Sequence, residues 1–251
     1  GYKLLATPSS VAASNGTSTD QIAISWGVIE FATYYEVWRG TPTLALIASP
    51  VSAVYSDTNA TPGIMYSYGI KACGNGGCSN ISDSDTGFRA VSPPAQIAAS
   101  DGTSTTSIQI SWDASDGATS YQIWSSTNSN SASASLLSSP PSTSYSDYDN
   151  QPGVTNYYWI KACASTGCSE FSNSDSGFRS YPSPSISASD GSSTQIVAVT
   201  WSNITGATSY QVWRNTNSNA ASATLLASPL TTNYNDSSAI PGVQYYYWGK
   251  T

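Results

Sequence analysis

Hydrophobic and polar residues alternate along several short segments of the chain. Ile108, Ile110 and Trp112 alternate with Gln109 and Ser111, which is the period of two expected of a strand with one face in the core. Clusters of Asp, Asn, Ser and Gly at 113–118, 128–130 and 147–153 separate such segments, and these residues favour turns. No segment has a convincing helical period. The pattern predicts an all-β chain of short antiparallel strands.

The whole pattern occurs three times. Trp26, Trp112 and Trp201 each end an alternating segment, and they lie 86 and 89 residues apart. Later in each period a Pro-Gly pair leads into an aromatic run that ends in a lysine. Units of about 90 residues with strands roughly every 8–12 residues predict a two-sheet antiparallel sandwich per repeat. The predicted domains are the tail of a preceding repeat or a linker at 1–6, repeat one at 7–91, repeat two at 92–181, and an incomplete repeat three at 182–251.

These residues resemble the fibronectin type III family. The family pattern has a Trp that ends the second strand, a Tyr-x-Val in the third, and a Pro-Gly-led aromatic run in the sixth. Here the run is Pro62-Gly-Ile-Met-Tyr66-Ser-Tyr68-Gly-Ile70-Lys-Ala72. The resemblance covers essentially the whole chain and implies tandem immunoglobulin-like sandwiches. It leaves function open, because such modules serve as spacers, adhesins and enzyme accessories alike.

The resemblance also assigns a corner tyrosine, whose hydroxyl ties a loop to the sheet in this family. Tyr66 and Tyr245 match that position, whereas repeat two has Asn156 there. We therefore expect repeat two to tie this corner differently.

The two ends of the sequence look like parts of repeats. Gly1-Tyr2-Lys3 has the character of Gly87-Phe88-Arg89, which closes repeat one, and Lys250-Thr251 matches the point at which Lys71 is followed by Ala-Cys. We expect the missing strand of repeat three to come from chain beyond Thr251. A neighbouring subunit that donates a strand is the alternative.

Composition narrows the class of protein. The net charge is −7 and only 9% of residues are charged, whereas ordinary soluble domains have about 25%. An acidic chain lacks the basic surface that nucleic acids and anionic membranes require, so we expect it to bind neither. No apolar stretch reaches the ~20 residues needed to span a bilayer, so we expect no direct membrane insertion by these residues. A surface of hydroxyl and amide groups indicates an extracellular or cell-surface protein.

Four cysteines form two local pairs, one in each of the first two repeats. A zinc site would need four converging ligands, but the chain has no His and the pairs lie 90 residues apart. Each pair brackets a short turn, which favours a disulfide and an oxidising compartment. The predicted disulfide cysteines are Cys73, Cys78, Cys163 and Cys168.

Catalytic chemistry is not evident. A chain without His lacks the commonest general base, and Asp57, Asp147 and Asp236 recur at one turn, which indicates capping and turn hydrogen bonds. Two further pairs, Asp83 with Asp85 and Asp113 with Asp116, have oxygens for calcium but lack the spacing of known calcium loops. We predict no enzyme activity, no cofactor and no metal site.

Strand parity predicts an aromatic face. If Trp26, Trp112 and Trp201 point into the core, the tryptophans of the next strand point out of the opposite face, beside those of the sixth strand. In one interpretation these rings cover the sheet and pack against Lys or Arg stems; in the other they form a contact surface for proteins or sugars. The candidate face comprises Trp38, Trp124, Tyr157, Trp159, Trp213, Tyr246 and Trp248.

Five Asn-x-Ser/Thr sequons could accept N-linked glycan in a suitable host; they begin at Asn15, Asn59, Asn80, Asn203 and Asn235. The junctions between repeats are short and each contains two prolines, Pro93 with Pro94 and Pro182 with Pro184. Such residues favour extended, stiff chain.

Together these features predict a non-catalytic extracellular structural or adhesive protein, a semi-rigid rod or filament at a microbial cell surface. Its expected partners are other copies of itself, other surface proteins or glycans. The alternative is a spacer or carbohydrate-binding accessory region of a secreted polysaccharide-degrading enzyme.

Overall fold

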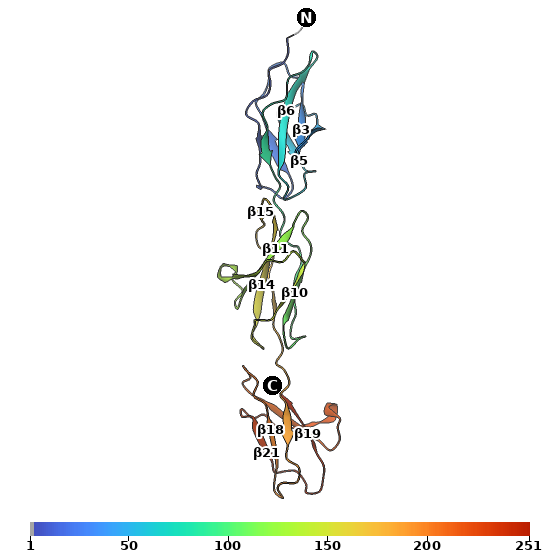
Figure 1. The fold of residues 1–251 in the computed structure, drawn as a ribbon, viewed down its shortest axis with the longest axis vertical. Coiled ribbons are helices and arrows are strands. Elements are labelled where there is room, and N and C mark those ends of the chain that lie inside the picture. Colours follow the sequence, from blue (N-terminus) through green and yellow to red (C-terminus); the bar gives the residue numbers. More distant parts are fainter. Residues whose placement is uncertain (1–2) are drawn as a thin grey trace. The chain divides into compact units, whose positions relative to one another are not determined.

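The structure is a computed structural model that describes residues 3–251. It consists of strands joined by turns, with two single-turn 3-10 helices, and each repeat contains two antiparallel sheets (Figure 1). The all-β sandwich architecture expected from the alternating pattern is confirmed. Gly1 and Tyr2, which the sequence likened to the end of a repeat, lie outside the described residues.

Repeat one contains a three-stranded sheet, β1-β2-β5, and a larger sheet in the order β4-β3-β6-β7 with β8 also paired to β6. Its strands are β1 (Ala12–Ala13), β2 (Ile22–Ser25), β3 (Tyr34–Gly40), β4 (Leu44–Ala48), β5 (Val54–Asp57), β6 (Tyr66–Gly74), β7 (Gly77–Cys78) and β8 (Asp85–Gly87).

Repeat two has the same topology, with sheets β9-β10-β13 and β12-β11-β14-β15, and β16 also paired to β14. Its elements are β9 (Ile97–Ala99), β10 (Ile108–Trp112), β11 (Ser120–Ser126), the 3-10 helix η1 (Ser131–Ser133), β12 (Ser135–Ser138), β13 (Ser144–Asp147), β14 (Asn156–Ala164), β15 (Gly167–Cys168) and β16 (Asp175–Gly177).

Repeat three contains the sheets β17-β18-β21 and β20-β19-β22. Its elements are β17 (Ile186–Ala188), β18 (Val197–Trp201), β19 (Gln211–Asn215), the 3-10 helix η2 (Ala220–Ser222), β20 (Thr224–Ala227), β21 (Asn233–Asp236) and β22 (Tyr246–Lys250).

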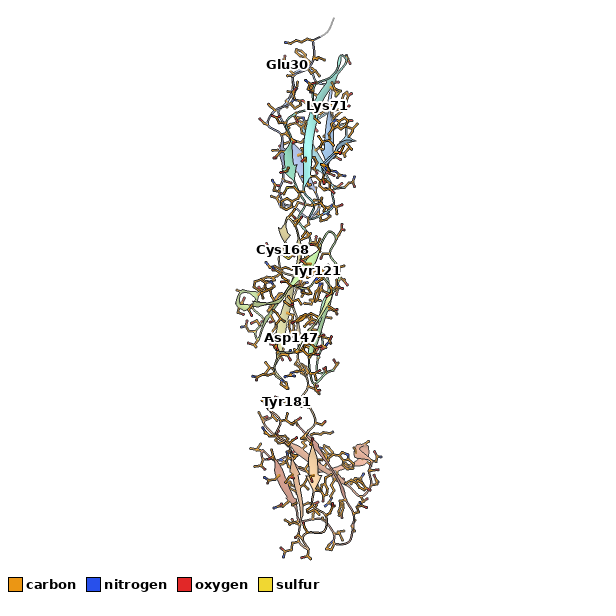
Figure 2. All side chains as sticks on the ribbon, in the orientation of Figure 1. Glu30, Lys71, Tyr121, Asp147, Cys168 and Tyr181 are labelled. Carbon is orange, nitrogen blue, oxygen red and sulfur yellow. A yellow bond between two sulfur atoms is a disulfide. The ribbon has the colours of Figure 1, made fainter. Side chains whose placement is uncertain are left out.

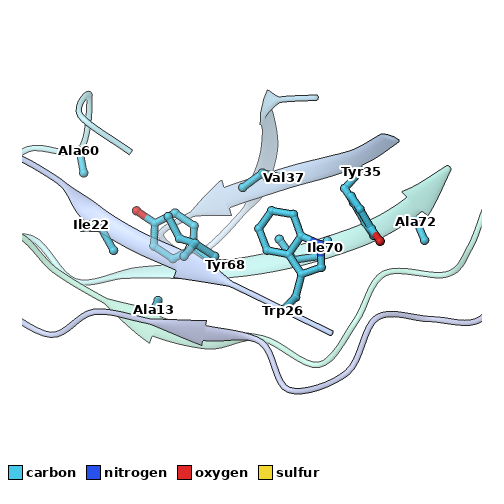
Figure 3. Packing of buried hydrophobic residues seen from close by; sticks show 10 residues of the cluster. Ala13, Ile22, Trp26, Tyr35, Val37, Ala60, Tyr68, Ile70 and Ala72 are labelled. Carbon is cyan, nitrogen blue, oxygen red and sulfur yellow. The ribbon is translucent and has the colours of Figure 1, made fainter. Parts of the chain in front are cut away.

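The core of repeat one lies between its two sheets and follows the alternation of the sequence. Ile22 and Ile24 of β2 are buried while Ala23 and Ser25 are exposed. The Trp26 ring meets Tyr35 edge-on, with ring centroids 5.3 Å apart, and Figure 3 shows both rings within this layer. Trp112 and Trp201 are buried in the same way in the other repeats.

The core of repeat three is smaller, because it contains four buried hydrophobic residues where repeat one has ten. Gly249 lies opposite Val212, at the register position that Ile70 occupies opposite Val37. A Cβ on Gly249 would lie 3.0 Å from the Pro184 side chain, so Pro184 takes up part of the space that the isoleucine fills in repeat one.

The division of the chain into two compact units does not follow the limits of the repeats. One unit contains 99–109, 146–156 and 176–251, and the other contains the remaining residues. The domain limits at 91/92 and 181/182 therefore stay a prediction from the sequence.

No helix among residues 3–251 has the length and apolar character needed to cross a membrane.

Candidate functional site

The outer face of the larger sheet carries the aromatic residues that strand parity selects. Trp124 lies directly opposite Trp159 across β11 and β14, and Trp213 lies opposite Trp248 across β19 and β22. In repeat one Trp38 lies opposite Gly69. Directly opposed residues share a face of the sheet, so each pair forms one patch.

In repeats one and three, the tryptophan of the third strand is engaged by two side chains of its own repeat. The Trp38 Nε1–H donates to Glu36 Oε2 at 3.1 Å, and the Lys71 ammonium lies 4.7 Å from the centroid of the Trp38 ring. In repeat three Trp213 donates to Gln211 at 3.2 Å, with Lys250 at 4.8 Å. The hydrogen bond uses the indole N–H, and the cation–π contact covers one face of the indole ring.

In repeat two a phenylalanine replaces the lysine as the direct cover of the indole ring. Trp124 donates from Nε1 to Gln122 at 3.3 Å, and Phe171 meets its ring edge-on, with centroids 5.5 Å apart. The Lys161 ammonium then lies 4.3 Å from the Phe171 centroid. The cation therefore stacks one layer further out than in repeats one and three.

A short segment after the paired cysteines brings this cover onto the face. Ser172 N–H donates to the Ile160 carbonyl, and the Ser172 hydroxyl accepts from Ile160 N–H, both at 2.9 Å. Ser82 makes the same two bonds with Ile70 in repeat one. Each serine fixes the residue before it, Phe171 or Ile81, over the outer face.

The sequence analysis missed this segment, although its pattern is visible. Cys78-Ser-Asn-Ile81-Ser82 and Cys168-Ser-Glu-Phe171-Ser172 share a Cys-Ser-x-apolar-Ser motif. An apolar residue between serines lacks the alternation of a strand. The segment is held on the sheet by hydrogen bonds to the serine hydroxyls as well as to the serine backbone. Comparison of the two repeats at this position would have found it.

Trp159 is the least exposed residue of the candidate face. Trp159 is on the outer face, but only 4% of it is exposed, and its ring stacks on Tyr157 with centroids 6.5 Å apart. Strand parity gives the face on which a side chain lies, and it contains no information about the segment that crosses that face. Trp159 is therefore part of the packed structure of repeat two and is not available to a ligand.

The other predicted face residues differ in exposure. Tyr246 is 37% exposed and stacks on Trp248 with centroids 6.4 Å apart. Trp38, Trp124, Tyr157, Trp213 and Trp248 are half-buried. The most open aromatic surface of the candidate face is thus the Tyr246–Trp248 pair of repeat three.

The predicted cysteine pairs form the disulfides Cys73–Cys78 and Cys163–Cys168, each with 4.0 Å between its Cα atoms. Both bridge neighbouring strands at the end of the sheet, and in repeat two the bridge lies near Tyr121 (Figure 2). Among residues 3–251, Glu36 with Cys73 and Cys78 is the one close group of potential metal ligands. Both of its sulfurs are in a disulfide, so they are not thiolate ligands.

The recurring aspartate does more than cap a turn. Asp57 accepts from Asn59 N–H at 3.0 Å, as a turn residue would, but it is 1% exposed and also accepts from Arg39 and from the Tyr68 hydroxyl, both at 2.8 Å. Burial of the Tyr68 hydroxyl and its hydrogen bond to Asp57 raise the pKa of Tyr68. Asp57 therefore joins the two sheets of repeat one through a partly buried ion pair with Arg39 and a hydrogen bond from Tyr68.

The matching aspartate of repeat three makes the same connections. Asp236 is fully buried and accepts from Arg214 at 2.6 Å and from the Tyr247 hydroxyl at 2.8 Å. Burial acts to raise the pKa of Asp236, but hydrogen bonds from Ser238, Tyr247 and Arg214 outweigh it and hold that pKa below its usual value. In repeat two Ser125 stands at the position of these arginines.

The corner position differs between repeats in the way that the resemblance implies. The Tyr66 hydroxyl accepts from Thr61 N–H and the Tyr245 hydroxyl from Ile240 N–H, both at 3.4 Å. In repeat two Asn156 instead donates to the Val154 carbonyl at 3.2 Å.

The remaining candidates lie on the surface. Asp83, Asp113 and Asp116 are exposed, whereas Asp85 accepts from Ala13 N–H at 2.9 Å and so ties two strands together. The asparagines of all five sequons are exposed, namely Asn15, Asn59, Asn80, Asn203 and Asn235.

Comparison with known proteins supports the fold alone. Neither a protein-family model nor a curated protein matches the chain. A two-domain fibronectin type III segment of chicken tenascin is similar at 21% identity and a TM-score of 0.54, over 67% of this chain and 97% of that one. This chain therefore has the fibronectin type III fold in tandem, as its motifs predict.

Two other solved structures overlap more loosely. They are the FN1–FN3 domains of chicken CNTN1, at 14% identity over 98% of this chain and 92% of that one, and a Fn3-like protein from Clostridium thermocellum, at 23% over 36% and 93%. Their TM-scores of 0.35 and 0.33 add nothing to the assignment.

Proposed function

We propose that this chain is a non-catalytic structural or adhesive array outside the cell, in which fibronectin type III sandwiches follow one another as a semi-rigid rod or filament. The two disulfides, the low charge and the proline-containing junctions all support this proposal. A disulfide persists in an oxidising compartment, and a surface with few charges suits a protein whose neighbours are copies of itself.

The observation that carries the proposal is that side chains of the same repeat already contact the tryptophans of the outer aromatic face. In every repeat the indole N–H of the third-strand tryptophan is bonded to a side chain two residues earlier, and its ring is covered by Lys71, Phe171 or Lys250. A sugar can stack only on an aromatic ring with an open face. The covered tryptophans of the third strands therefore stabilise the sandwich and do not serve as a sugar-binding surface.

One observation favours the alternative, a carbohydrate-binding accessory region. Tyr246 and Trp248 stack side by side, and Tyr246 is exposed. Adjacent aromatic rings of this kind could support a polysaccharide chain. This second candidate is confined to repeat three.

Affinity electrophoresis in gels containing cellulose derivatives, xylan or chitin derivatives separates the two candidates. We expect the chain to migrate equally with and without polysaccharide, and Tyr246→Ala to migrate as the parent does. Retardation of the parent that disappears in Tyr246→Ala, but persists in the control Tyr148→Ala, would favour the carbohydrate-binding alternative. Tyr148 is 63% exposed in repeat two and lies outside the candidate face.

A further inference from the structure

The two disulfides occupy the same place in their repeats, at the end of the larger sheet. Cys73 lies directly opposite Cys78 across β6 and β7, and Cys163 lies directly opposite Cys168 across β14 and β15. Each bridge closes a hairpin of the same length, with 4.0 Å between its Cα atoms. Because the backbone arrangement is the same, a difference in reactivity between the two bonds comes from the side chains around them.

The sulfurs of repeat two are more accessible than those of repeat one. Cys73 has no exposed surface, whereas 7% of Cys163 is exposed. Cys78 is half-buried, but Cys168 is exposed (Figure 2). A thiolate opens a disulfide by direct attack on one of its sulfur atoms, so access to that atom limits the rate of exchange. Repeat two meets this requirement best at Cys168.

A tyrosine shields the disulfide of repeat one and has no counterpart in repeat two. Tyr34 of β3 lies directly opposite Cys73, and its hydroxyl is 3.9 Å from Cys78 Sγ. Ser120 of β11 has the same register position, opposite Cys163. A serine has no ring to extend across the sulfurs, and this accounts for the greater exposure of the second pair.

A carboxylate beside the sulfurs is also confined to repeat one. The Glu36 carboxylate lies within 4.8 Å of both sulfurs of its repeat, and Gln122 has the corresponding register position in repeat two. Both side chains accept from the indole N–H of the tryptophan two residues later, so they are oriented alike. In the part of the chain that the structure describes, no carboxylate forms such a group with Cys163 and Cys168, the exposed Glu170 included. Glu36 therefore repels an approaching thiolate, and Gln122 does not.

The lysines of the sixth strand enlarge this electrostatic difference. Lys71 lies directly opposite Glu36, whereas Lys161 lies opposite the neutral Gln122. Each lysine comes two residues before a bridged cysteine, on the same face of its strand. Glu36 balances the charge of Lys71, but Gln122 does not balance that of Lys161. A cation near a cysteine favours its thiolate, so Cys163 is the better leaving group.

We propose that the Cys163–Cys168 disulfide is a site of thiol–disulfide exchange, at which a thiol from outside the chain becomes covalently attached to Cys168. The attacking thiolate forms a bond to Cys168 Sγ. The bond between the two cysteine sulfurs breaks, and its electron pair leaves with Cys163 Sγ, which takes up a proton from water. The products are a mixed disulfide and one free thiol, with no net oxidation. The Cys73–Cys78 disulfide is shielded and stays closed.

Limited exchange with reduced glutathione tests the proposal on the folded 251-residue chain. Trypsin cuts after Lys and Arg, so it releases each cysteine pair in its own peptide, 72–89 and 162–179. After acid quenching and alkylation of free thiols, mass spectrometry therefore measures both reactions in one sample. We expect peptide 162–179 to open at least about tenfold faster, with glutathione at Cys168, because access and charge act in the same direction. Equal rates, faster opening of peptide 72–89, or glutathione at Cys163 would overturn the proposal.

Exchanging the surrounding residues between the repeats provides matched variants. Tyr34→Ser with Glu36→Gln gives repeat one the surroundings of repeat two and should speed the opening of peptide 72–89 severalfold. Asp20→Asn changes an exposed carboxylate of the same repeat and should leave that rate unchanged. Ser120→Tyr with Gln122→Glu should slow the opening of peptide 162–179. Unchanged rates in both double variants would show that these side chains do not control the exchange, and the comparison within the parent chain stands even if a double variant folds poorly.

Discussion

At the scale of single residues, the buried aspartate distinguishes the repeats most clearly. Asp57 and Asp236 each hold an arginine and a tyrosine hydroxyl across the sandwich. A buried carboxylate is costly unless it is paired and hydrogen-bonded, and here each one is. Repeat two has Ser125 in place of the arginine, so the surroundings of the matching Asp147 differ from those of Asp57 and Asp236.

The lowered pKa of Asp236 makes the stability of repeat three depend on pH. An unfolded aspartate has a pKa of about 3.9, so the stabilisation is complete above that value and is lost as the pH falls through the lower, folded pKa. We expect the core amides of Val199 and Val212 to lose hydrogen-exchange protection as the pH falls below about 4, after correction for the intrinsic exchange rate.

Asp236→Asn should remove this pH dependence and lower stability at pH 7 by about 1–3 kcal/mol, because Arg214 loses its charged partner. Asp190→Asn, which changes an exposed carboxylate of the same repeat, is the control and should keep the parent profile. A variant Asp236→Asn with the same acid dependence as the parent would show that another group is responsible.

At the scale of elements, the disulfide hairpins should stabilise their own repeats modestly. Closing a loop between Cys73 and Cys78, five residues apart, restricts the unfolded chain by about 2 kcal/mol. The double variant Cys73→Ser/Cys78→Ser should therefore weaken protection of β3 and leave β19 of repeat three, which has no cysteine, unchanged.

Mass spectrometry checks the bonds themselves. The intact mass without reductant should show the loss of two hydrogens per pair. Cysteines that alkylate readily without reductant would contradict the bonds, and equal weakening of β3 and β19 would contradict a local effect.

The segment that covers the outer face provides a second test at this scale. Phe171→Ala should uncover the ring of Trp124, shift tryptophan emission to longer wavelength, and cost about 1–2 kcal/mol, less than a fully buried phenylalanine because Phe171 is half-buried. Tyr148→Ala removes an exposed ring of the same repeat and should change neither quantity. An unshifted spectrum in Phe171→Ala would show that Phe171 does not shield the indole.

At the scale of the whole molecule, the proposed array depends on its junctions. Two prolines in each junction restrict the backbone and favour extended chain. We expect small-angle scattering from the chain to show an elongated particle. Replacing Pro93, Pro94, Pro182 and Pro184 by Gly-Ser should broaden the distribution of interatomic distances. A compact globule from the parent chain would contradict the semi-rigid array.

The sequence by itself determined the fold and the pairing of the cysteines. Alternation such as that of Ile22 and Ile24 reports which side of a strand is buried, and it does so locally, because successive side chains of a strand point to opposite faces. The spacing of Cys73 and Cys78 around a tight turn is likewise a local property. The alternation recurs in all three repeats and the cysteine pair in the first two, so the sandwich fold could be predicted for each repeat from the alternation alone.

Only the tertiary structure decided what lies over each face. Parity placed Trp159 on the outer face, but the segment that ends at Ser172 covers that face, and no alternation along β14 records a segment that crosses it. The partners of Asp57 were also hidden, because Arg39 and Tyr68 come from strands that lie beside it only after the two sheets have packed. Burial and partnership depend on which distant segments meet, and a local pattern does not carry that information.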